Sequence, residues 1–331
     1  FWLIFLLSGK VFTSFIVGML FGIHPLQVEP VAWITGRKDV LYSFFFLSAI
    51  ISYLYYRKKE IGKYYWFSLG LFILSCLAKG VAIVLPLILL LTDYLLGRRF
   101  DWRTVKEKIP FLGISAIFGI IAAMIQLSGR KPVPELPFAF LQNILIASYG
   151  IVFYLTKLAV PLKLSCFYPF PEGIIFGRMF SLFFLLPLFI VIFLILVVYL
   201  SRKFSRKIIF GGLFFMLTIL PVSRIIPLLG TAITADRYAY IPSIGILYIF
   251  SEVFYLLYRT RLKFARMIKI FLLIILTGAV GIFSSLTWRR CGVWNNGIIL
   301  WSNVLENYPN VLLAYNNRGN AYSNKGEYVK A

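Results

Sequence analysis

The stretch His24-Pro-Leu-Gln-Val-Glu-Pro-Val-Ala-Trp-Ile-Thr-Gly-Arg-Lys-Asp39 decides how this chain is organised. It holds the only histidine, two of the 12 acidic residues and two basic residues, and apolar sequence lies on both sides of it. Pro25 and Pro30 lack an N–H and restrict the residues before them, so the chain leaves the hydrocarbon here and turns along its surface. We therefore expect a hinge between two membrane spans.

The apolar runs around this hinge indicate a multi-span membrane protein. Hydrophobic residues make up 60% of the chain and charged residues 14%, whereas a soluble domain is roughly half apolar and a quarter charged. The runs are continuous, and backbone groups in lipid must be paired within their own segment, so we predict helices and an all-α polytopic bundle. The expected spans are Val11–Ile23, Val40–Tyr56, Tyr64–Ala78, Val81–Leu96, Ile109–Leu127, Ala139–Val160, Met179–Leu200, Ile208–Val222, Ile241–Tyr258 and Ile268–Thr287.

The net charge of +22 predicts topology and not a nucleic-acid partner, because the Lys and Arg residues lie in short loops between the runs. The predicted cytoplasmic clusters are Lys10, Arg57–Lys63, Arg98–Lys108, Arg202–Lys207 and Arg259–Lys269. The hinge, Lys79, Leu162–Arg178, Ser223–Tyr240 and everything after Trp288 are then exoplasmic. If every run crossed the membrane once, the last two basic clusters would lie on the outer side. One run must therefore not make a single crossing. We expect this of Ala139–Val160, the most polar run, as a re-entrant helix, an interface-lying helix or a broken pair.

Glu29, Trp33 and Arg37 follow one another at intervals of four residues within the hinge. In one short amphipathic helix they would share a face. One interpretation is therefore an interfacial hinge closed by a Glu29–Arg37 ion pair.

The other interpretation of the hinge is a site for an anionic group. Arg37 and Lys38 would donate to a phosphate, and Asp39 and Glu29 would be metal ligands or orienting carboxylates. His24 would add a ligand or a proton carrier, or would simply be a polar cap.

A second polar segment, Thr234–Pro242, contains Asp-Arg-Tyr-Ala-Tyr. It is either a helix start capped by Asp236 with an aromatic belt of Tyr238 and Tyr240, or a place where Arg237 binds a phosphate or sugar.

Three further features lie near the ends of the runs. The Cys166–Glu172 loop, with Tyr168, is aromatic and stiffened by prolines, which suits interface packing, a lid or a sugar-stacking platform. We expect Lys79 to meet a lipid phosphate and Asp93 to be a structural cap.

The tail changes character after Trp288. Its aromatic and small residues fit one 34-residue frame typical of a tetratricopeptide repeat: Trp301, Val304, Pro309, Tyr315, Gly319, Tyr322, Tyr328 and Ala331. This predicts a membrane domain over residues 1–287 and the start of a repeat region over 288–331. Because part of a repeat array cannot bury a solenoid core, we expect more repeats to follow, and the start within an apolar run suggests a fragment at that end too.

Three motifs in the same order carry a family resemblance: His-Pro-x-x-x-Glu…Arg-x-Asp from His24, Tyr-Pro-x-Pro from Tyr168, and Ala-Asp-Arg-Tyr-x-Tyr-x-Pro from Ala235. Together they resemble the transmembrane and tetratricopeptide-repeat proteins, which are similar to GT-C glycosyltransferases, including O-mannosyltransferase-like members. The resemblance implies a GT-C-like bundle followed by an exoplasmic repeat solenoid. It also implies transfer of a sugar, with mannose one option, from a polyprenyl-phosphate donor to a protein hydroxyl or another exoplasmic acceptor. The main acidic base is implied to lie before Phe1.

On this basis we assign candidate roles. The catalytic candidates are Asp39, Glu29 and His24; the substrate-binding candidates are Arg37, Lys38, Arg237, Asp236, Tyr238 and Tyr168; and Asp39 and Glu29 are the candidate ligands of a divalent metal ion, Mg²⁺ or Mn²⁺. The expected partners are a lipid-linked sugar and a protein acceptor bound by the repeats, in a bacterial inner membrane or the endoplasmic reticulum. The alternatives are a noncatalytic membrane-anchored scaffold and a lipid or glycan transporter.

Overall fold

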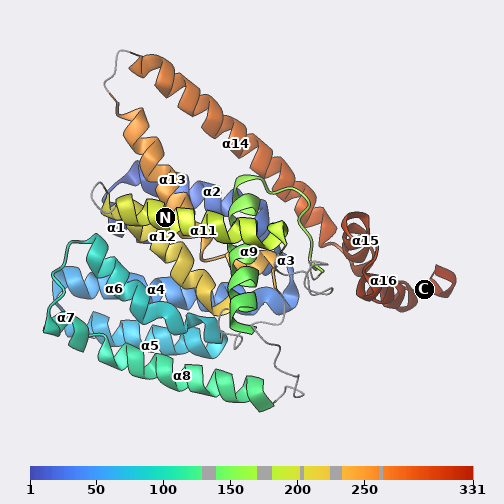
Figure 1. Cartoon of the computed structure of the whole chain (residues 1–331), viewed down its shortest axis with the longest axis horizontal. Coiled ribbons are helices and arrows are strands. Elements are labelled where there is room, and N and C mark those ends of the chain that lie inside the picture. Colours follow the sequence, from blue (N-terminus) through green and yellow to red (C-terminus); the bar gives the residue numbers. More distant parts are fainter. Residues whose placement is uncertain (129–138, 170–180, 202–204, 224–232, 261–263, 331) are drawn as a thin grey trace.

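A computed structural model describes residues 1–128, 139–169, 181–201, 205–223, 233–260 and 264–330 (Figure 1). The described residues form helices and connecting segments, and no strand occurs among them. The α-helices are α1 (Trp2–Ser8), α2 (Val11–Ile23), α3 (Val28–Ala32), α4 (Arg37–Lys59), α5 (Gly62–Ala78), α6 (Leu85–Leu95), α7 (Trp102–Lys106), α8 (Ile109–Ser128), α9 (Ala139–Ala159), α11 (Leu182–Leu200), α12 (Arg206–Ile219), α13 (Ser243–Tyr258), α14 (Ala265–Val293), α15 (Gly297–Asn307) and α16 (Leu312–Asn324). Short 3₁₀ helices are η1 (Pro25–Gln27), η2 (Ile34–Gly36), η3 (Gly80–Val84), η5 (Leu220–Val222), η6 (Asp236–Ala239) and η7 (Tyr328–Lys330).

Several of these helices suit a membrane. By length and composition, five helices of the described part are long and apolar enough to cross one, or six if the α2–α3 pair, bent by 60°, is one span. The five are Ile34–Lys59, Trp102–Ile125, Phe140–Ala159, Leu182–Leu200 and Ala265–Val293. The predicted fold class, an all-α polytopic membrane bundle, is confirmed.

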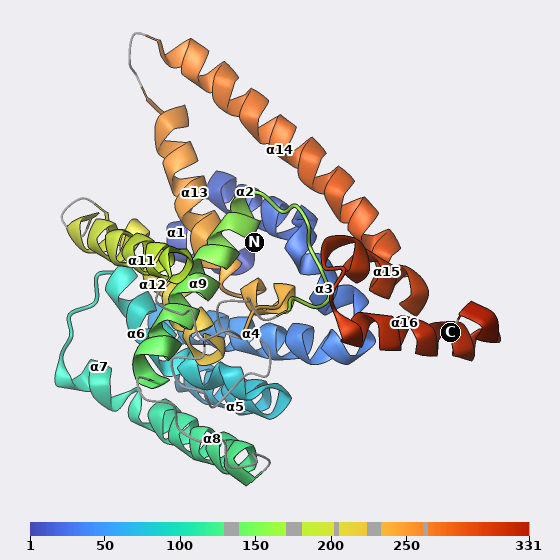
Figure 2. The same ribbon diagram turned by 45° about the vertical axis from the view of Figure 1, so that its right-hand side comes forward.

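Basic segments far apart in the sequence meet at one end of the bundle. Lys10 and Lys207 both donate to the buried Glu252 carboxylate, at 2.8 and 2.7 Å. The Arg206 guanidinium lies 5.9 Å from the centre of the Tyr94 ring. Figures 1 and 2 show α7 and the end of α4 on one side, and α3, α15 and α16 on the opposite side. The described basic residues named here thus lie at one end, away from α3, α15 and α16. Residues 170–178, 202–204, 224–232 and 261–263 of the predicted loops lie outside the described residues, and that the basic end is cytoplasmic stays a prediction.

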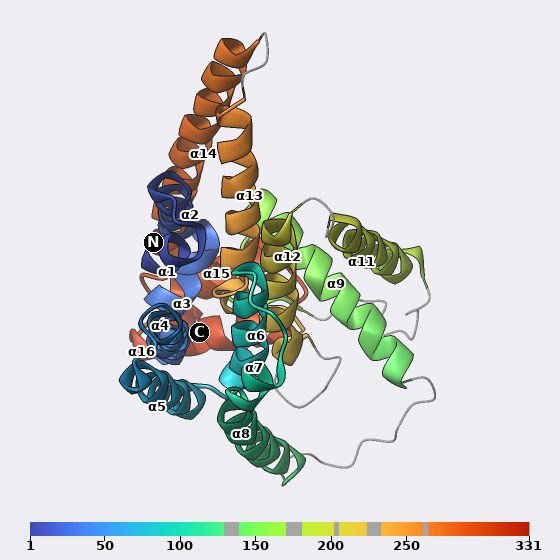
Figure 3. The ribbon, with the colours of Figure 1, turned by 90° about the vertical axis from the view of Figure 1, so that its left-hand side faces the viewer.

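The most polar run forms α9, a single unbroken helix, so the broken-pair alternative for this segment is wrong. Figure 1 shows α9 running across the direction of α4. In Figure 3, where α4 is seen nearly end-on, α9 is seen along its length. The helix thus lies crosswise to α4. Since it is also one of the five helices long and apolar enough to cross a membrane, the expectation that it does not cross once stays a prediction. The break in the chain occurs instead between α2 and α3.

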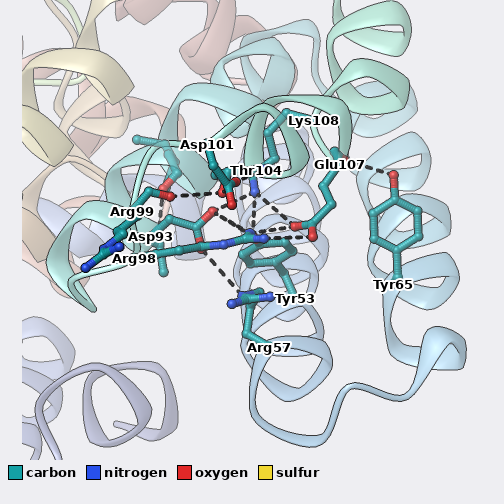
Figure 4. A network of polar contacts seen from close by, with 12 residues as sticks. Tyr53, Arg57, Tyr65, Asp93, Arg98, Arg99, Asp101, Thr104, Glu107 and Lys108 are labelled. Atoms are coloured by element: carbon teal, nitrogen blue, oxygen red, sulfur yellow. Dashed lines mark hydrogen bonds and ion pairs between the residues drawn. The ribbon is translucent and has the colours of Figure 1, made fainter.

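A buried polar network closes the basic end (Figure 4). The Asp93 carboxylate accepts from the Tyr53 hydroxyl at 2.7 Å and from Lys108 Nζ at 2.6 Å, and Arg98 donates twice to Glu107, at 2.6 and 2.8 Å. Asp93 is therefore not a helix cap as expected but the centre of a network that joins α4, α6 and the start of α8. Loss of Asp93 would leave the fully buried Lys108 ammonium without its closest carboxylate, so the network fixes how these helices meet.

The hinge is not one amphipathic helix. Pro25 begins η1, α3 ends at Ala32 with Trp33 in extended conformation, and η2 then leads into α4. The i, i+4, i+8 argument requires a continuous helix, and the extended backbone at Trp33 breaks it. Glu29 and Arg37 therefore do not share a face.

The C-terminal helices continue from the bundle without a break at the predicted boundary. α14 runs past Thr287 to Val293, and α15 and α16 then pack as a helical pair. Their identification as a tetratricopeptide repeat stays a prediction, and Ala331 lies outside the described residues.

A close helix crossing positions the second polar segment. Gly211 of α12 and Gly245 of α13 face each other so closely that a Cβ on either one would press into the carbonyl oxygen of the other. Small residues allow this kind of backbone contact in membrane bundles. Since α13 begins just after η6, this crossing holds η6 in place.

We expect Gly245→Ala to lower the stability of the protein by ~1–3 kcal/mol, because the methyl group forces α12 and α13 apart. Gly278→Ala is the matched control, since a Cβ at that α14 position meets nothing within 4 Å. Thermal unfolding in detergent measures both. Equal melting temperatures for the two variants would contradict the close crossing.

Candidate functional site

The centre of the site is a buried ion pair between the hinge and η6. Arg237 Nη1 donates to Glu29 Oε1 at 2.6 Å, and the Arg237 backbone N–H donates to Oε2 at 3.2 Å. Glu29 is 1% exposed. The partner of Glu29 is thus 208 residues away in the sequence, and the expected pair with Arg37 is wrong.

Aromatic rings enclose the Arg237 guanidinium. It lies 5.1 Å from the centre of the Trp33 ring and 5.1 Å from that of Tyr238. Cation–π contacts of this kind hold a guanidinium in place as well as stabilising it. The hinge therefore supplies both the carboxylate and one of the rings that orient Arg237.

A second ion pair lies beside the first. Asp39, in the first turn of α4, is fully buried, and Lys79 Nζ donates to its Oδ1. Lys79 also lies 5.5 Å from the ring centre of Tyr238, so both ion pairs converge on this tyrosine. Burial lowers the pKa of Lys79, and the Asp39 carboxylate opposes that shift. The sequence suggested a lipid phosphate for Lys79 and gave no sign of Asp39 as its partner.

Glu29 and Asp39 differ in how many of their carboxylate oxygens already have a hydrogen-bond partner. Both Glu29 oxygens accept hydrogen bonds from Arg237. Asp39 Oδ2 is buried and has no hydrogen-bond partner among the described residues. Asp39 thus combines one anchored oxygen with one that is free to accept a proton or a hydrogen bond.

Arg37 and Lys38 are exposed at the start of α4 and form no ion pair with any described residue. Cations at a helix N-terminus oppose the helix dipole, so they do not stabilise α4. As exposed cations without an acidic partner among the described residues, they attract anions. These two residues lie where the sequence placed them, at the exposed edge of the Asp39 site.

Asp236 joins three elements. Its Oδ1 accepts from the Tyr168 hydroxyl at 2.6 Å, and its Oδ2 lies 3.5 Å from Arg290 Nη2. The cap expected of Asp236 is wrong, because Ala235 is the N-cap of η6 and no side chain caps it. Burial, and then the Glu29 carboxylate, raise the pKa of Asp236 to about 7, while Arg290 opposes the shift.

Tyr168 belongs to this site, and its hydroxyl also accepts from the Ser165 backbone N–H at 3.1 Å. Pro171 of the same loop lies outside the described residues. Arg290, at the end of a long apolar helix, was not among the predicted residues. A basic side chain that ends a membrane span is normally explained as a snorkelling residue, so the sequence carries no specific signal for its role.

His24 is fully buried and has a backbone partner on each ring nitrogen. The Leu26 N–H donates to Nδ1 at 3.2 Å, so Nε2 carries the proton and donates to the Leu158 carbonyl at 3.0 Å. The ring also meets Phe283 edge-on at 4.7 Å between centroids. His24 therefore caps η1 and anchors the hinge to α9 and α14, which leaves no nitrogen free for a ligand.

The carboxylates do not by themselves form a metal site. Within the described ranges, no three side chains of His, Cys, Asp or Glu gather closely enough to hold an ion. Glu29 is committed to Arg237, and Asp39 to Lys79. A divalent ion at this site stays a prediction.

An apolar cavity of about 750 Å³ lies between α6, α9, α11, α12 and α13. Its walls include Leu91, Ile151, Leu155, Val191, Phe215 and Ile246. Ile151 and Phe215 also belong to the buried cluster that contains Tyr154 and Tyr238. Residues that line the cavity therefore pack in the same buried cluster as Tyr154 and Tyr238 of the site.

Comparison with known proteins gives one informative similarity. The chain is 28% identical over 295 residues to a protein O-mannosyl-transferase of Caenorhabditis elegans. The aligned region covers 87% of this chain and 40% of that protein. No family model and no solved structure matches the chain. The sequence is thus similar to part of a mannosyltransferase, at a distance that leaves its own activity to be tested.

Proposed function

We propose that this chain is part of an integral-membrane glycosyltransferase that moves mannose from a polyprenyl-phosphate donor to a hydroxyl of an exoplasmic protein. The observation that carries the proposal is the convergence of the Asp39–Lys79 and Glu29–Arg237 pairs on Tyr238. This cluster lies at the end of the bundle opposite the basic loops. The similarity to a protein O-mannosyl-transferase supports the choice of sugar and acceptor.

The donor's phosphate would bind at the start of α4. Arg37 and Lys38 are exposed and have no acidic partner among the described residues, so they are available to an anion. Arg237 and Lys79 add positive charge a short distance further in. A phosphate that arrives at this edge meets basic groups before it meets the buried carboxylates, which avoids charge repulsion.

The donor's lipid chain would occupy the apolar cavity. Its volume of about 750 Å³ and its apolar walls fit a branched hydrocarbon, and α9 forms a wall of the cavity and contacts the site. Burial of an isoprenoid chain here would stabilise the complex by the ordinary hydrophobic contribution of ~25 cal/mol per Å².

In the proposed reaction, Asp39 Oδ2 accepts the proton of the acceptor hydroxyl as the hydroxyl oxygen attacks the anomeric carbon. The bond between that carbon and the phosphate oxygen breaks, and the polyprenyl phosphate leaves with the electron pair. Negative charge grows on the phosphate as this happens, so fixed cations stabilise the transition state more than the ground state. Glu29 orients Arg237 in this scheme and does not act as the base.

Asp39→Asn tests the proposed base. In full-length protein supplied with a radiolabelled mannosyl-phosphoryl polyprenol, we expect transfer to fall by ~10²-fold or more, because an amide cannot take the proton. Asp101→Asn is the matched control, since Asp101 is exposed and lies at the basic end. Full activity of Asp39→Asn at normal expression would remove Asp39 from the mechanism.

The packing of α15 against α16 favours a second candidate, a noncatalytic scaffold whose C-terminal helices bind partners. The same assay separates the two. Binding of a partner protein without any transfer by the wild-type protein, across several polyprenyl-phosphate sugars, would support the scaffold.

Asp236 predicts a pH dependence of stability. Its pKa in the folded protein is about 7, well above the ordinary value of an aspartate, so the folded state holds a proton that the unfolded state loses above about pH 4. The contribution of this group to stability is therefore present at low pH and declines as pH rises towards 7. The charged or titratable groups that interact with Asp236 from other elements include Glu29, Lys157, Tyr168 and Arg290, and also Tyr154, Cys166 and Tyr308.

We expect Asp236→Asn to remove this decline, because the amide does not titrate. Melting temperatures of wild type, Asp236→Asn and Asp101→Asn, measured between pH 4 and 8, give the comparison. An unchanged slope in Asp236→Asn would show that another group is responsible.

A further inference from the structure

Arg290 connects the last turn of α14 to three separate segments. Its Nη1 donates to the Leu164 carbonyl at 2.9 Å and to Asn303 Oδ1 of α15 at 3.1 Å. Its Nη2 lies 3.5 Å from Asp236 Oδ2. The side chain is only 6% exposed, so these contacts are made away from water.

Apolar contacts join the same segments. Cys166 and Phe167 pack against a buried cluster of the C-terminal helices that includes Val304 and Leu305. The rings of Tyr168 and Tyr308 meet edge-on, with centroids 6.2 Å apart. Figure 2 shows α15 close to α3 and to the chain that follows α9. The segment from Leu164 to Tyr168 is therefore held between the C-terminal pair and the site.

The planar guanidinium explains why an arginine serves here. One side chain with donors in a fixed fork can reach a backbone carbonyl, an amide oxygen and a carboxylate together, whereas a lysine ammonium is a compact point charge. Burial of this cation is balanced by Asp236, whose other oxygen holds Tyr168. Displacement of α15 would thus disturb Asp236 and Tyr168 together.

We propose that Arg290 is a positioning residue through which the α15–α16 pair sets the geometry of Asp236 and Tyr168 in the site. The C-terminal pair is then a part of the site and not a tethered module. A protein bound on α15–α16 would reach the site through the contacts of Arg290 and Tyr308. The effect on transfer rests on the proposed function, whereas the mechanical coupling does not.

The coupling is tested without any activity measurement. Cys166 is partly buried beneath α15, so its reaction rate with a maleimide reports whether the joint is closed. In full-length protein with the exposed Cys291 changed to Ser, we expect Arg290→Gln to speed labelling of Cys166 by roughly 10-fold or more, as loss of charged hydrogen bonds favours local opening. Arg289→Gln is the matched control, since Arg289 is adjacent and exposed.

Two milder variants keep the test valid if Arg290→Gln does not fold. Asn303→Ala removes one of the three contacts, and Arg290→Lys keeps the charge without the fork. We expect both to speed labelling less than Arg290→Gln does. Labelling rates equal to that of Arg289→Gln in all of them would overturn the coupling.

The positioning role is tested by kinetics. We expect Arg290→Gln to lower kcat for transfer with the KM for the donor unchanged, because the proposed phosphate-binding residues lie elsewhere. Loss of Arg290 also removes a cation that lowers the pKa of Asp236, so a limb of the pH–rate profile that is due to Asp236 should move to higher pH. Faster labelling with unaltered kcat and pH profile would overturn the positioning role. If Arg290→Gln speeds labelling relative to Arg289→Gln but the wild-type protein transfers no sugar, the proposed function alone is overturned.

Discussion

The buried pair of Glu29 and Arg237 is the interaction on which the site depends. An ionised carboxylate that is 1% exposed is stable only with a partner, and here one guanidinium and one backbone N–H occupy both of its oxygens. The pair fixes the hinge against η6, which in turn is held by the close crossing of α12 and α13. Its consequence extends to Asp236, the residue before Arg237 in η6: burial raises the pKa of this carboxyl, and the nearby Glu29 carboxylate raises it further.

The two ends of the bundle use charge in different ways. At the basic end, Asp93 and Glu107 have cation partners on both sides, and the network is closed within the chain. At the other end Glu29 and Asp39 each have one cation partner. Arg37 and Lys38 remain exposed, however, and Asp39 Oδ2 has no hydrogen-bond partner among the described residues. Satisfied networks stabilise a structure, whereas unused donors and acceptors beside one another are what a substrate can bind. This difference, and not the number of charges, makes the hinge end the better candidate for chemistry.

The sequence predicted the fold class because this depends on local composition, and the same composition singles out the hinge as a candidate site, which stays a prediction. Apolar runs define spans, and prolines with polar residues define the hinge at His24–Asp39. It could not predict the partners. Glu29 binds Arg237, and Asp39 binds Lys79, from segments that pack together only in the folded bundle. The expected Glu29–Arg37 pair assumed a continuous helix, and the extended backbone at Trp33 removes that assumption.

The roles of the charged residues could not be predicted for the same reason. Composition treats Glu29, Asp39 and Asp236 as equivalent carboxylates, and only their hydrogen bonds distinguish them. Both Glu29 oxygens accept hydrogen bonds from Arg237. Asp236 Oδ1 accepts from Tyr168, and Asp236 Oδ2 has no hydrogen bond within the described ranges but lies 3.5 Å from the buried Arg290 cation. Asp39 Oδ2 has no hydrogen-bond partner among the described residues. A base must have a lone pair that the folded protein has not already used. The geometry therefore selects among candidates that the sequence can name but cannot rank, and it adds Arg290, whose importance arises from the three segments it joins.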